Sequence, residues 1–238
     1  MQLRVAQQTD RGRVRHNNED SLIANPPLVA VADGVGGQNA GEVASALAVD
    51  VLEEWIATLE RDGGDKLREA ASDAHRRIYA RAQAETQLHG MATTLTLWMG
   101  VWPWYYLLQV GDSRYYLWRD GALTQVTRDQ TIAQDLVDQG VFTRTIANRS
   151  QFAHVLSSSI GGEQTAPVVT RLRADWRNVH LLCSDGLTKH VSDERIAERL
   201  ASMTNAQQVC EQLLQDALDD GGSDNITIIV GRALLREG

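Results

Sequence analysis

The stretch at residues 28–42, LVAVADGVGGQNAGE, decides how the rest of the chain can be interpreted. Its first five residues are apolar and include β-branched side chains, which is typical of a buried strand. The strand pattern stops at Asp33, and the glycine-rich loop that follows leaves the backbone open to a closely bound ligand. A helix is expected from Ala40. A strand-to-helix turn with no further function explains this stretch equally well when it is taken alone.

The same arrangement recurs along the chain, because three more apolar runs are bordered by an aspartate beside glycine or serine. The four aspartates are Asp33, Asp112, Asp185 and Asp224. If the strands bring these carboxylates to one edge of a sheet assembly, their charges repel one another unless cations lie between them. The repeated pattern therefore predicts a cation site.

Length and composition indicate a single domain of ordinary globular character. The chain has 238 residues, of which 43% are hydrophobic and 23% are charged, and its formal net charge is -8. Nucleic-acid binding and adsorption on anionic membranes both need clustered Lys and Arg, so this charge argues against either partner.

The cysteines and the termini favour a cytoplasmic protein without membrane insertion. Cys183 and Cys210 form no Cys-x-x-Cys pair and are interpreted as buried thiols in a reducing compartment. The N-terminal residues lack the apolar core of a signal peptide. The most apolar window, residues 95–110, is short and contains Pro103, so we expect two strands there and no membrane span.

Periodicity predicts a helical layer packed on antiparallel strands. Helices are expected at residues 40–59 and 65–89, and His75 and His89 are interpreted as solvent-facing helix residues. A meander with an Asp120-Gly121 turn follows. The remaining expected elements are strands at 3–7, 168–172, 179–183 and 226–230, and helices at 131–139, 193–200 and 205–219.

Residues 129–161 have weak periodicity and many polar side chains, which suggests a mobile insertion at the rim of the site. Arg144 and Arg149 in this segment are candidates for contacting an acidic or phosphorylated partner. Surface arginines without a specific partner are the plainer alternative.

A polar stretch at residues 9–21 holds three arginines and three acids between two expected strands. It can be a solvated loop with local ion pairs. Alternatively, Arg15 is a bidentate phosphate clamp, and Glu19 and Asp20 are outer ligands of a cation.

Six segments, taken in order, match the motifs of one known family. They are Asp10-x-Gly12-x-x-Arg15-x-x-Asn18-Glu19-Asp20-Ser21, Ala32-Asp33-Gly34-Val35-Gly36-Gly37, Thr93-Thr94, Val110-Gly111-Asp112-Ser113-Arg114, Cys183-Ser184-Asp185-Gly186-Leu187 and Gly221-Gly222-x-Asp224-Asn225-Ile226-Thr227. Each motif is weak alone, but their order across nearly the whole chain is specific. The sequence resembles the metal-dependent serine/threonine protein phosphatases, the PPM or type 2C class, in a compact bacterial form.

The resemblance implies an α+β fold, in which a β-sandwich of two antiparallel sheets is flanked by pairs of α-helices. It makes residues 1–238 one catalytic domain and residues 129–161 a flap within it. It also implies a pair of Mn²⁺ or Mg²⁺ ions, with Asp33 bridging them and the Gly34 carbonyl helping to hold one. Asp185 and Asp224 would hold the other ion.

The remaining site residues are also assigned through the resemblance. Arg15 would clamp the phosphate, Glu19 and Asp20 would contact ion-bound waters, and Asp112 with Asp185 would form a third, weaker metal site. Asn225, Gly36 and Gly37 are expected to lie next to the metal ligands and hold them in position without contacting the ions.

The activity implied is hydrolysis of phosphoserine and phosphothreonine on proteins by a metal-activated water, since all-oxygen ligands select hard cations. Val35 occupies a position where some relatives carry a proposed histidine acid, and His16 and His190 are candidates only by neighbourhood. A separate serine/threonine kinase would supply the substrates. The alternatives are a non-catalytic phosphoprotein-binding regulator on the same fold and a hydrolase of small phosphoesters.

Overall fold

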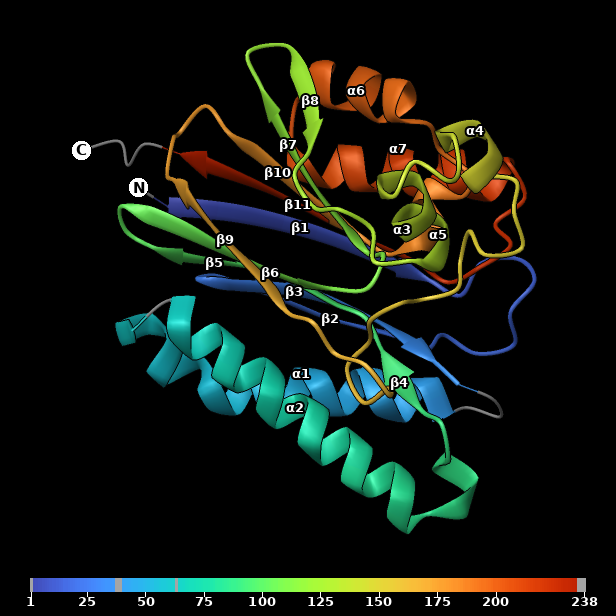
Figure 1. Cartoon of the computed structure of the whole chain (residues 1–238). Coiled ribbons are helices and arrows are strands. Elements are labelled where there is room, and N and C mark those ends of the chain that lie inside the picture. Colours follow the sequence, from blue (N-terminus) through green and yellow to red (C-terminus); the bar gives the residue numbers. More distant parts are fainter. Residues whose placement is uncertain (1, 37–39, 63, 235–238) are drawn as a thin grey trace.

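The structure, a computed structural model, describes residues 2–36, 40–62 and 64–234. Two β-sheets pack face to face, and helices cover the outer face of each one (Figure 1). This layered arrangement confirms the α+β sandwich that the sequence indicated.

Neighbouring strands in both sheets run antiparallel. The first sheet has the order β1 (Gln2–Asp10), β11 (Ile226–Leu234), β10 (Val179–Cys183), β7 (Arg114–Arg119) and β8 (Ala122–Gln125). The second has the order β2 (Asp20–Asn25), β3 (Leu28–Val35), β5 (Leu95–Val101), β6 (Trp104–Val110) and β9 (Val168–Arg173), and the short β4 (Ala92–Thr93) pairs with β3.

The central strands are apolar on both faces because each lies between a helix layer and the opposite sheet. In β3, Leu28, Ala30 and Ala32 pack toward the helices, whereas Val29 and Val31 join the core between the sheets. This alternation follows from the two-residue repeat of a strand. It explains why these strands are continuous apolar runs in the sequence.

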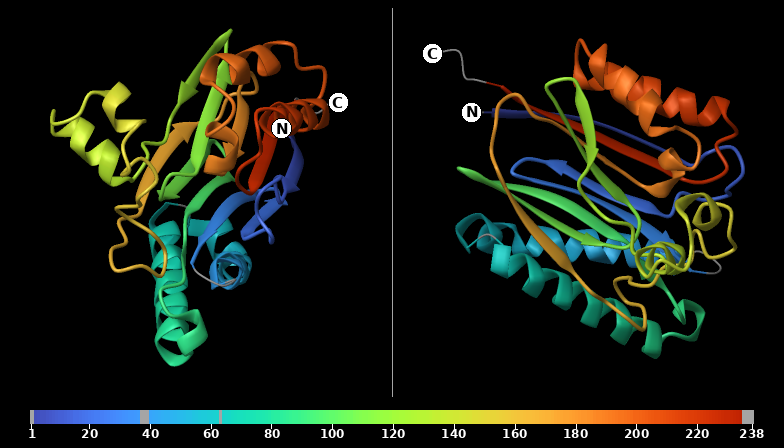
Figure 2. Two further views of the ribbon diagram at one scale, coloured as in Figure 1. Left: turned by 90° about the vertical axis from the view of Figure 1, so that its right-hand side faces the viewer. Right: turned by 45° about the horizontal axis from the view of Figure 1, so that its top comes forward.

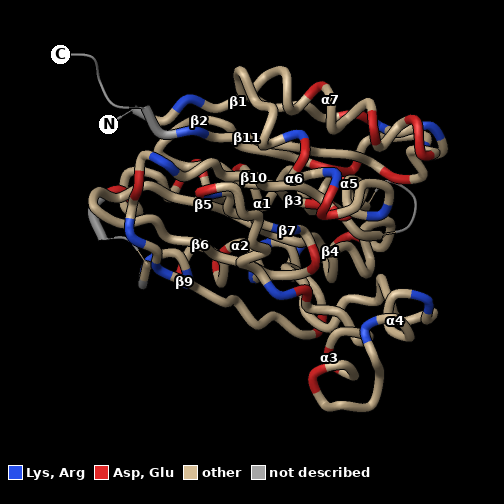
Figure 3. Tube along the Cα trace, turned by 90° about the horizontal axis from the view of Figure 1, so that it is seen from above, with Lys and Arg blue, Asp and Glu red and all other residues tan. Residues whose placement is uncertain are grey.

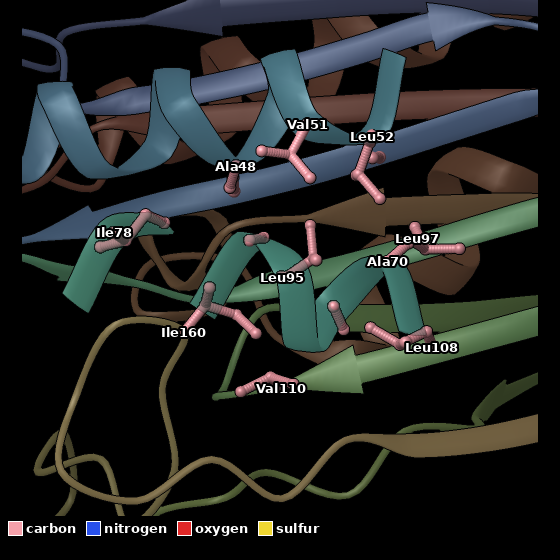
Figure 4. Close-up of a cluster of buried hydrophobic side chains, with 14 of the residues drawn as sticks. Ala48, Val51, Leu52, Ala70, Ile78, Leu95, Leu97, Leu108, Val110 and Ile160 are labelled. Carbon is pink, nitrogen blue, oxygen red and sulfur yellow. The ribbon is translucent and has the colours of Figure 1, made fainter. Parts of the chain in front are cut away.

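Helices α1 (Ala40–Asp62) and α2 (Gly64–Ala84) cover the second sheet. Figure 4 shows their side chains meeting those of β5 and β6, among them Ala48, Leu52, Leu95 and Leu108. The predicted helix at 65–89 ends earlier, at Ala84, and a 3-10 turn at Thr86–Leu88 follows.

Helices α5 (Asp185–Thr188), α6 (Asp193–Ala201) and α7 (Ala206–Asp219) cover the first sheet. Their buried positions include Leu187, Ile196 and Leu213, which contact the outer face of β10 and β11. The pair α6 and α7 was expected from periodicity, whereas the single turn of α5 was not.

The segment at residues 129–161 contains α3 (Ile132–Asp138) and α4 (Arg144–Ala147) and projects from the sheets in the left view of Figure 2. Both of its ends are anchored. Gln130 exchanges backbone and side-chain hydrogen bonds with Gly111, and Ile160 exchanges two backbone hydrogen bonds with Thr93.

The interpretation of His75 as a solvent-facing residue was wrong. Its side chain is half-buried, and Nδ1 lies 3.1 Å from the Gly161 backbone nitrogen and 2.8 Å from the Thr165 hydroxyl. The chain that leaves segment 129–161 packs against α2 here, a contact that helix periodicity cannot predict. His89 is exposed, as expected.

Acidic and basic residues are interspersed along the trace, and several acidic positions lie near the labels β3 and α5 in Figure 3. No helix in the described part of the chain combines the length and the apolar character needed to cross a membrane.

Candidate metal centre

Asp33 lies near the end of β3, where neighbouring threonines fix its backbone. The Thr94 hydroxyl accepts a hydrogen bond from the Asp33 amide at 2.9 Å, and the Asp33 carbonyl accepts from both the Thr93 hydroxyl and the Thr94 amide at 2.9 Å. These bonds account for the Thr-Thr motif, because they hold the backbone from which the Asp33 side chain projects.

The backbone after Asp33 packs so closely that only glycine fits. A Cβ atom on Gly34 would lie 2.2 Å from the Gly41 carbonyl oxygen, and one on Gly41 would lie 2.5 Å from Oε2 of Glu19. The missing side chains let β3, α1 and the start of β2 converge at the site. Gly36 lines the cavity here, and Gly37 lies outside the described residues.

Asp20 on β2 is the direct cross-strand partner of Asp33. Its Oδ2 accepts hydrogen bonds from the Ser184 and Thr227 hydroxyls at 2.8 and 2.6 Å, whereas Oδ1 is buried and has no partner among the described residues. Like charges that face each other across strands are destabilising. Burial, opposed by the two hydroxyls, raises the pKa of Asp20 to about 6.

The pKa of the Asp33 carboxyl is also raised. Its pKa lies well above the usual value, first because of burial and then because of the negative charges of Asp20, Asp185, Asp112 and Asp224. The four aspartates marked by the sequence pattern thus lie close enough to act on one another.

Asp185 at the start of α5 and Asp224 before β11 contact basic side chains of the protein. Lys189 places its ammonium 2.7 Å from Asp185 Oδ2 and 2.6 Å from Asp224 Oδ2. Arg15 Nε lies 2.8 Å from Asp224 Oδ1, and His154 Nδ1 lies 3.5 Å from Asp185 Oδ2. Burial opposes ionisation of Asp185, but His154 and Lys189 outweigh it and lower its pKa.

Asp112 follows β6 and is buried at the same place. Asp112, His154 and Asp185 each offer a ligand atom, and these atoms lie within 4.8 Å of one another. Burial, followed by the charge of Asp185, keeps the pKa of Asp112 well above its usual value.

Asn225 connects the polar stretch before β2 to the start of β11. Its Nδ2 donates to the carbonyls of Arg11 and Asn17 at 2.9 and 2.8 Å, and its Oδ1 accepts from the Glu19 amide at 2.8 Å. Asn225 therefore positions the loop that carries Arg15 and Glu19.

Two adjoining cavities open onto the acids. One, of about 530 Å³, is lined by Arg15, Glu19, Asp33, Gly34 and Asp224, among others. The second, of about 490 Å³, lies under segment 129–161 and includes Arg144. Asp112, His154, Asp185 and Lys189 line both cavities.

Three other predicted candidates lie apart from this chemistry. Arg149 is exposed and is not among the described residues that line either cavity. Both ring nitrogens of His190 are engaged, Nδ1 with Asp220 at 3.1 Å and Nε2 with Ser223 at 2.8 Å, so His190 holds the loop before Asp224. His16 is exposed.

The donor set fits hard divalent cations. Carboxylates from four separate parts of the chain converge, and Asp20 and Asp33 face each other across adjacent strands. One buried carboxylate oxygen, Oδ1 of Asp20, has no hydrogen-bond partner within the described part of the chain. Oxygen ligands of this kind suit Mg²⁺ and Mn²⁺. Lys189 and His154 are the two site residues that sequence reasoning missed.

Comparisons with known proteins agree with this site. The family model for protein phosphatase 2C matches residues 10–220 of this chain. Serine/threonine protein phosphatase PstP of Mycobacterium tuberculosis is 42% identical over 233 residues, which are 96% of this chain and 44% of that protein. The chain therefore spans less than half the length of this relative.

Two further similarities extend over nearly the whole chain. Serine/threonine phosphatase stp of Listeria welshimeri is 34% identical over 242 residues, covering 97% of this chain and 96% of that protein. The crystal structure of the PstP catalytic domain in complex with two manganese ions superposes with a TM-score of 0.86 at 41% identity, covering 97% of each chain. The chain belongs to the protein phosphatase 2C family.

Proposed function

We propose that this protein is a metal-dependent phosphatase that removes phosphate from phosphoserine and phosphothreonine in proteins. The convergence of Asp33, Asp112, Asp185 and Asp224 in one cavity carries the proposal. The names of the relatives from M. tuberculosis and L. welshimeri support the substrate class.

In this proposal, Asp33 and the Gly34 carbonyl would hold one ion, and Asp33, Asp185 and Asp224 would hold the other. Asp112 and Asp185, with His154 beside them, would form a third, weaker site. Bound Mn²⁺ or Mg²⁺ would lower the pKa of a coordinated water and neutralise charge on the phosphate.

The chain's own residues would bind and orient the phosphate. Arg15 lies at the cavity wall with a guanidinium that matches two phosphate oxygens, and it would exchange its contact with Asp224 for the substrate. Glu19 and the partnerless Oδ1 of Asp20 would accept hydrogen bonds from waters in the site. Gly34 and Gly36 line the cavity in which the phosphate would lie.

Residues 129–161 would act as the flap of this single catalytic domain and contact the substrate protein through Arg144, which lines the second cavity. A separate serine/threonine kinase would generate the substrates. A cytoplasmic location remains a prediction; it is supported by free, buried thiols at Cys183 and Cys210.

Phosphate release from a phosphothreonine peptide and from free nucleotides, measured with Mn²⁺, tests the proposal. We expect the peptide to be the better substrate and Asp33→Asn to remove the activity. Preference for nucleotides would favour a small-phosphoester hydrolase, and tight phosphopeptide binding without turnover would favour a non-catalytic regulator.

A further inference from the structure

The chain carries its positive charge almost entirely on arginine, and its two lysines lie in very different places. Lys66 is on α2, where its ammonium lies 2.7 Å from Glu69. Lys189 follows the single turn of α5 and lies at the metal centre.

Lys189 occupies the space between two proposed metal ligands. One ammonium group contacts Oδ2 of Asp185 at 2.7 Å and Oδ2 of Asp224 at 2.6 Å. Asp185 is four residues earlier, so the helical turn of α5 points both side chains the same way. The Lys189 side chain is only 20% exposed. The ammonium is therefore a positive charge enclosed at the position where these two carboxylates would hold an ion.

The charges around Lys189 explain why it adopts this position. The charge of Lys189 also acts on the Asp112 carboxyl. Arg15 contacts Asp224, and the His154 ring contacts the same Asp185 oxygen as Lys189. A partly buried cluster of carboxylates with no cation is costly, and a compact ammonium reduces that cost.

We propose that Lys189 is an internal counter-cation of the metal centre, which neutralises Asp185 and Asp224 before an ion binds and competes with that ion for them. The inference rests on the proposed metal site. It assigns to Lys189 a positioning role, in which the residue sets the affinity for the ion that Asp185 and Asp224 share.

A lysine suits a carboxylate contact that a metal ion has to displace. Lysine carries a point charge on a flexible four-carbon chain, whereas arginine makes a fixed bidentate contact with a carboxylate. An incoming divalent ion can thus displace the ammonium through rotation of the side chain alone, with no movement of α5.

Calorimetric titration of the metal-free protein with Mn²⁺ tests the competition. Lys189→Met keeps most of the apolar stem and removes the charge, so we expect the Mn²⁺ ion shared by Asp185 and Asp224 to bind about tenfold or more tightly. Lys66→Met removes the other lysine and its carboxylate contact far from the site, and should bind like wild type. Unchanged or weaker Mn²⁺ binding by Lys189→Met would overturn the proposal.

A second measurement uses only the wild-type chain, so it does not depend on the folding of a variant. Acetylation of the two lysines is followed by mass spectrometry with and without Mn²⁺. Displacement predicts that Lys189 becomes several times more reactive when Mn²⁺ is present, while Lys66 does not change. Equal or lower reactivity of Lys189 would contradict displacement.

Failure of the proposed metal site and failure of the proposed role of Lys189 give different results. If neither wild type nor Lys189→Met binds Mn²⁺, the metal site itself is wrong and the role of Lys189 falls with it. If wild type binds Mn²⁺, loses binding in Asp33→Asn and shows no effect of Lys189→Met, the metal site stands and only the counter-cation role is rejected.

Discussion

At the residue scale, the site consists of acids whose charges oppose one another. Asp20 and Asp33 face each other across β2 and β3, and Asp185 and Asp224 share one ammonium. Such an arrangement costs stability and is favoured when it serves binding of a cation. The account therefore predicts that changes to these residues move stability and activity in opposite directions.

Asp33→Asn tests this opposition. Removal of one negative charge from the cluster should raise the melting temperature of the metal-free protein by several degrees. The same change should lower Mn²⁺-dependent hydrolysis of p-nitrophenyl phosphate by a factor of about 100 or more, because the proposed ligand to both ions is lost. A variant that is both less stable without metal and fully active would be inconsistent with the account.

Asp20→Asn tests the pH dependence. The folded-state pKa of about 6 lies above the unfolded value, so the folded chain binds more protons between these values and its stability falls as the pH rises. In metal-free buffer, we expect the variant to exceed wild type in melting temperature by a margin that about doubles between about pH 5 and about pH 7.5. Asp50→Asn, on the exposed face of α1, should show no such trend. A constant difference for Asp20→Asn would exclude a raised pKa.

The acids could be predicted because each stands at the end of an apolar strand, but their cationic neighbours could not. Asp185 and Lys189 are four residues apart, a spacing that places them together if residues 185–188 are helical. That single turn has no periodicity of its own. His154 reaches Asp185 only through the path of segment 129–161, which the sequence left undefined.

At the scale of elements, the sequence predicted the strands well, since those buried on both faces are unbroken apolar runs. Boundaries and docking contacts were less predictable. Helix α2 ends at Ala84, and His75 on it receives the chain leaving segment 129–161. These contacts depend on tertiary packing, which leaves no repeat in the sequence.

Segment 129–161 offers a matched pair of arginines for testing substrate recognition. Arg144 lines the second cavity, whereas Arg149 is exposed away from it. We expect Arg144→Ala to raise the KM for a phosphopeptide by about three- to tenfold through a lost charge contact, with little change for p-nitrophenyl phosphate. Arg149→Ala should behave like wild type in both assays. Equal effects of the two substitutions would argue against a specific role for Arg144.

At the scale of the whole molecule, the site connects the two sheets. Asp33 belongs to β3 of the second sheet, whereas Asp185 and Asp224 border β10 and β11 of the first. An ion held by all three side chains would therefore bind the folded sandwich and not its separated parts.

Metal binding should stabilise the entire fold. With Mn²⁺ at about 100 times its dissociation constant, linkage gives about 2.7 kcal/mol. For a chain of this size, that corresponds to a rise of about 5–10 °C in melting temperature. Scanning fluorimetry with and without Mn²⁺ measures the rise, and Asp224→Asn should reduce it. An unchanged wild-type melting temperature in saturating Mn²⁺ would contradict a site that spans both sheets.

The most direct measurement of the central claim is anomalous diffraction from crystals of this protein soaked in Mn²⁺. We predict two strong manganese peaks, with the Asp33 carboxylate between them, Asp185 and Asp224 coordinating one, and the Lys189 ammonium moved away. Crystals in which Asp33, Asp185 and Asp224 keep their positions with no manganese between them would contradict the account.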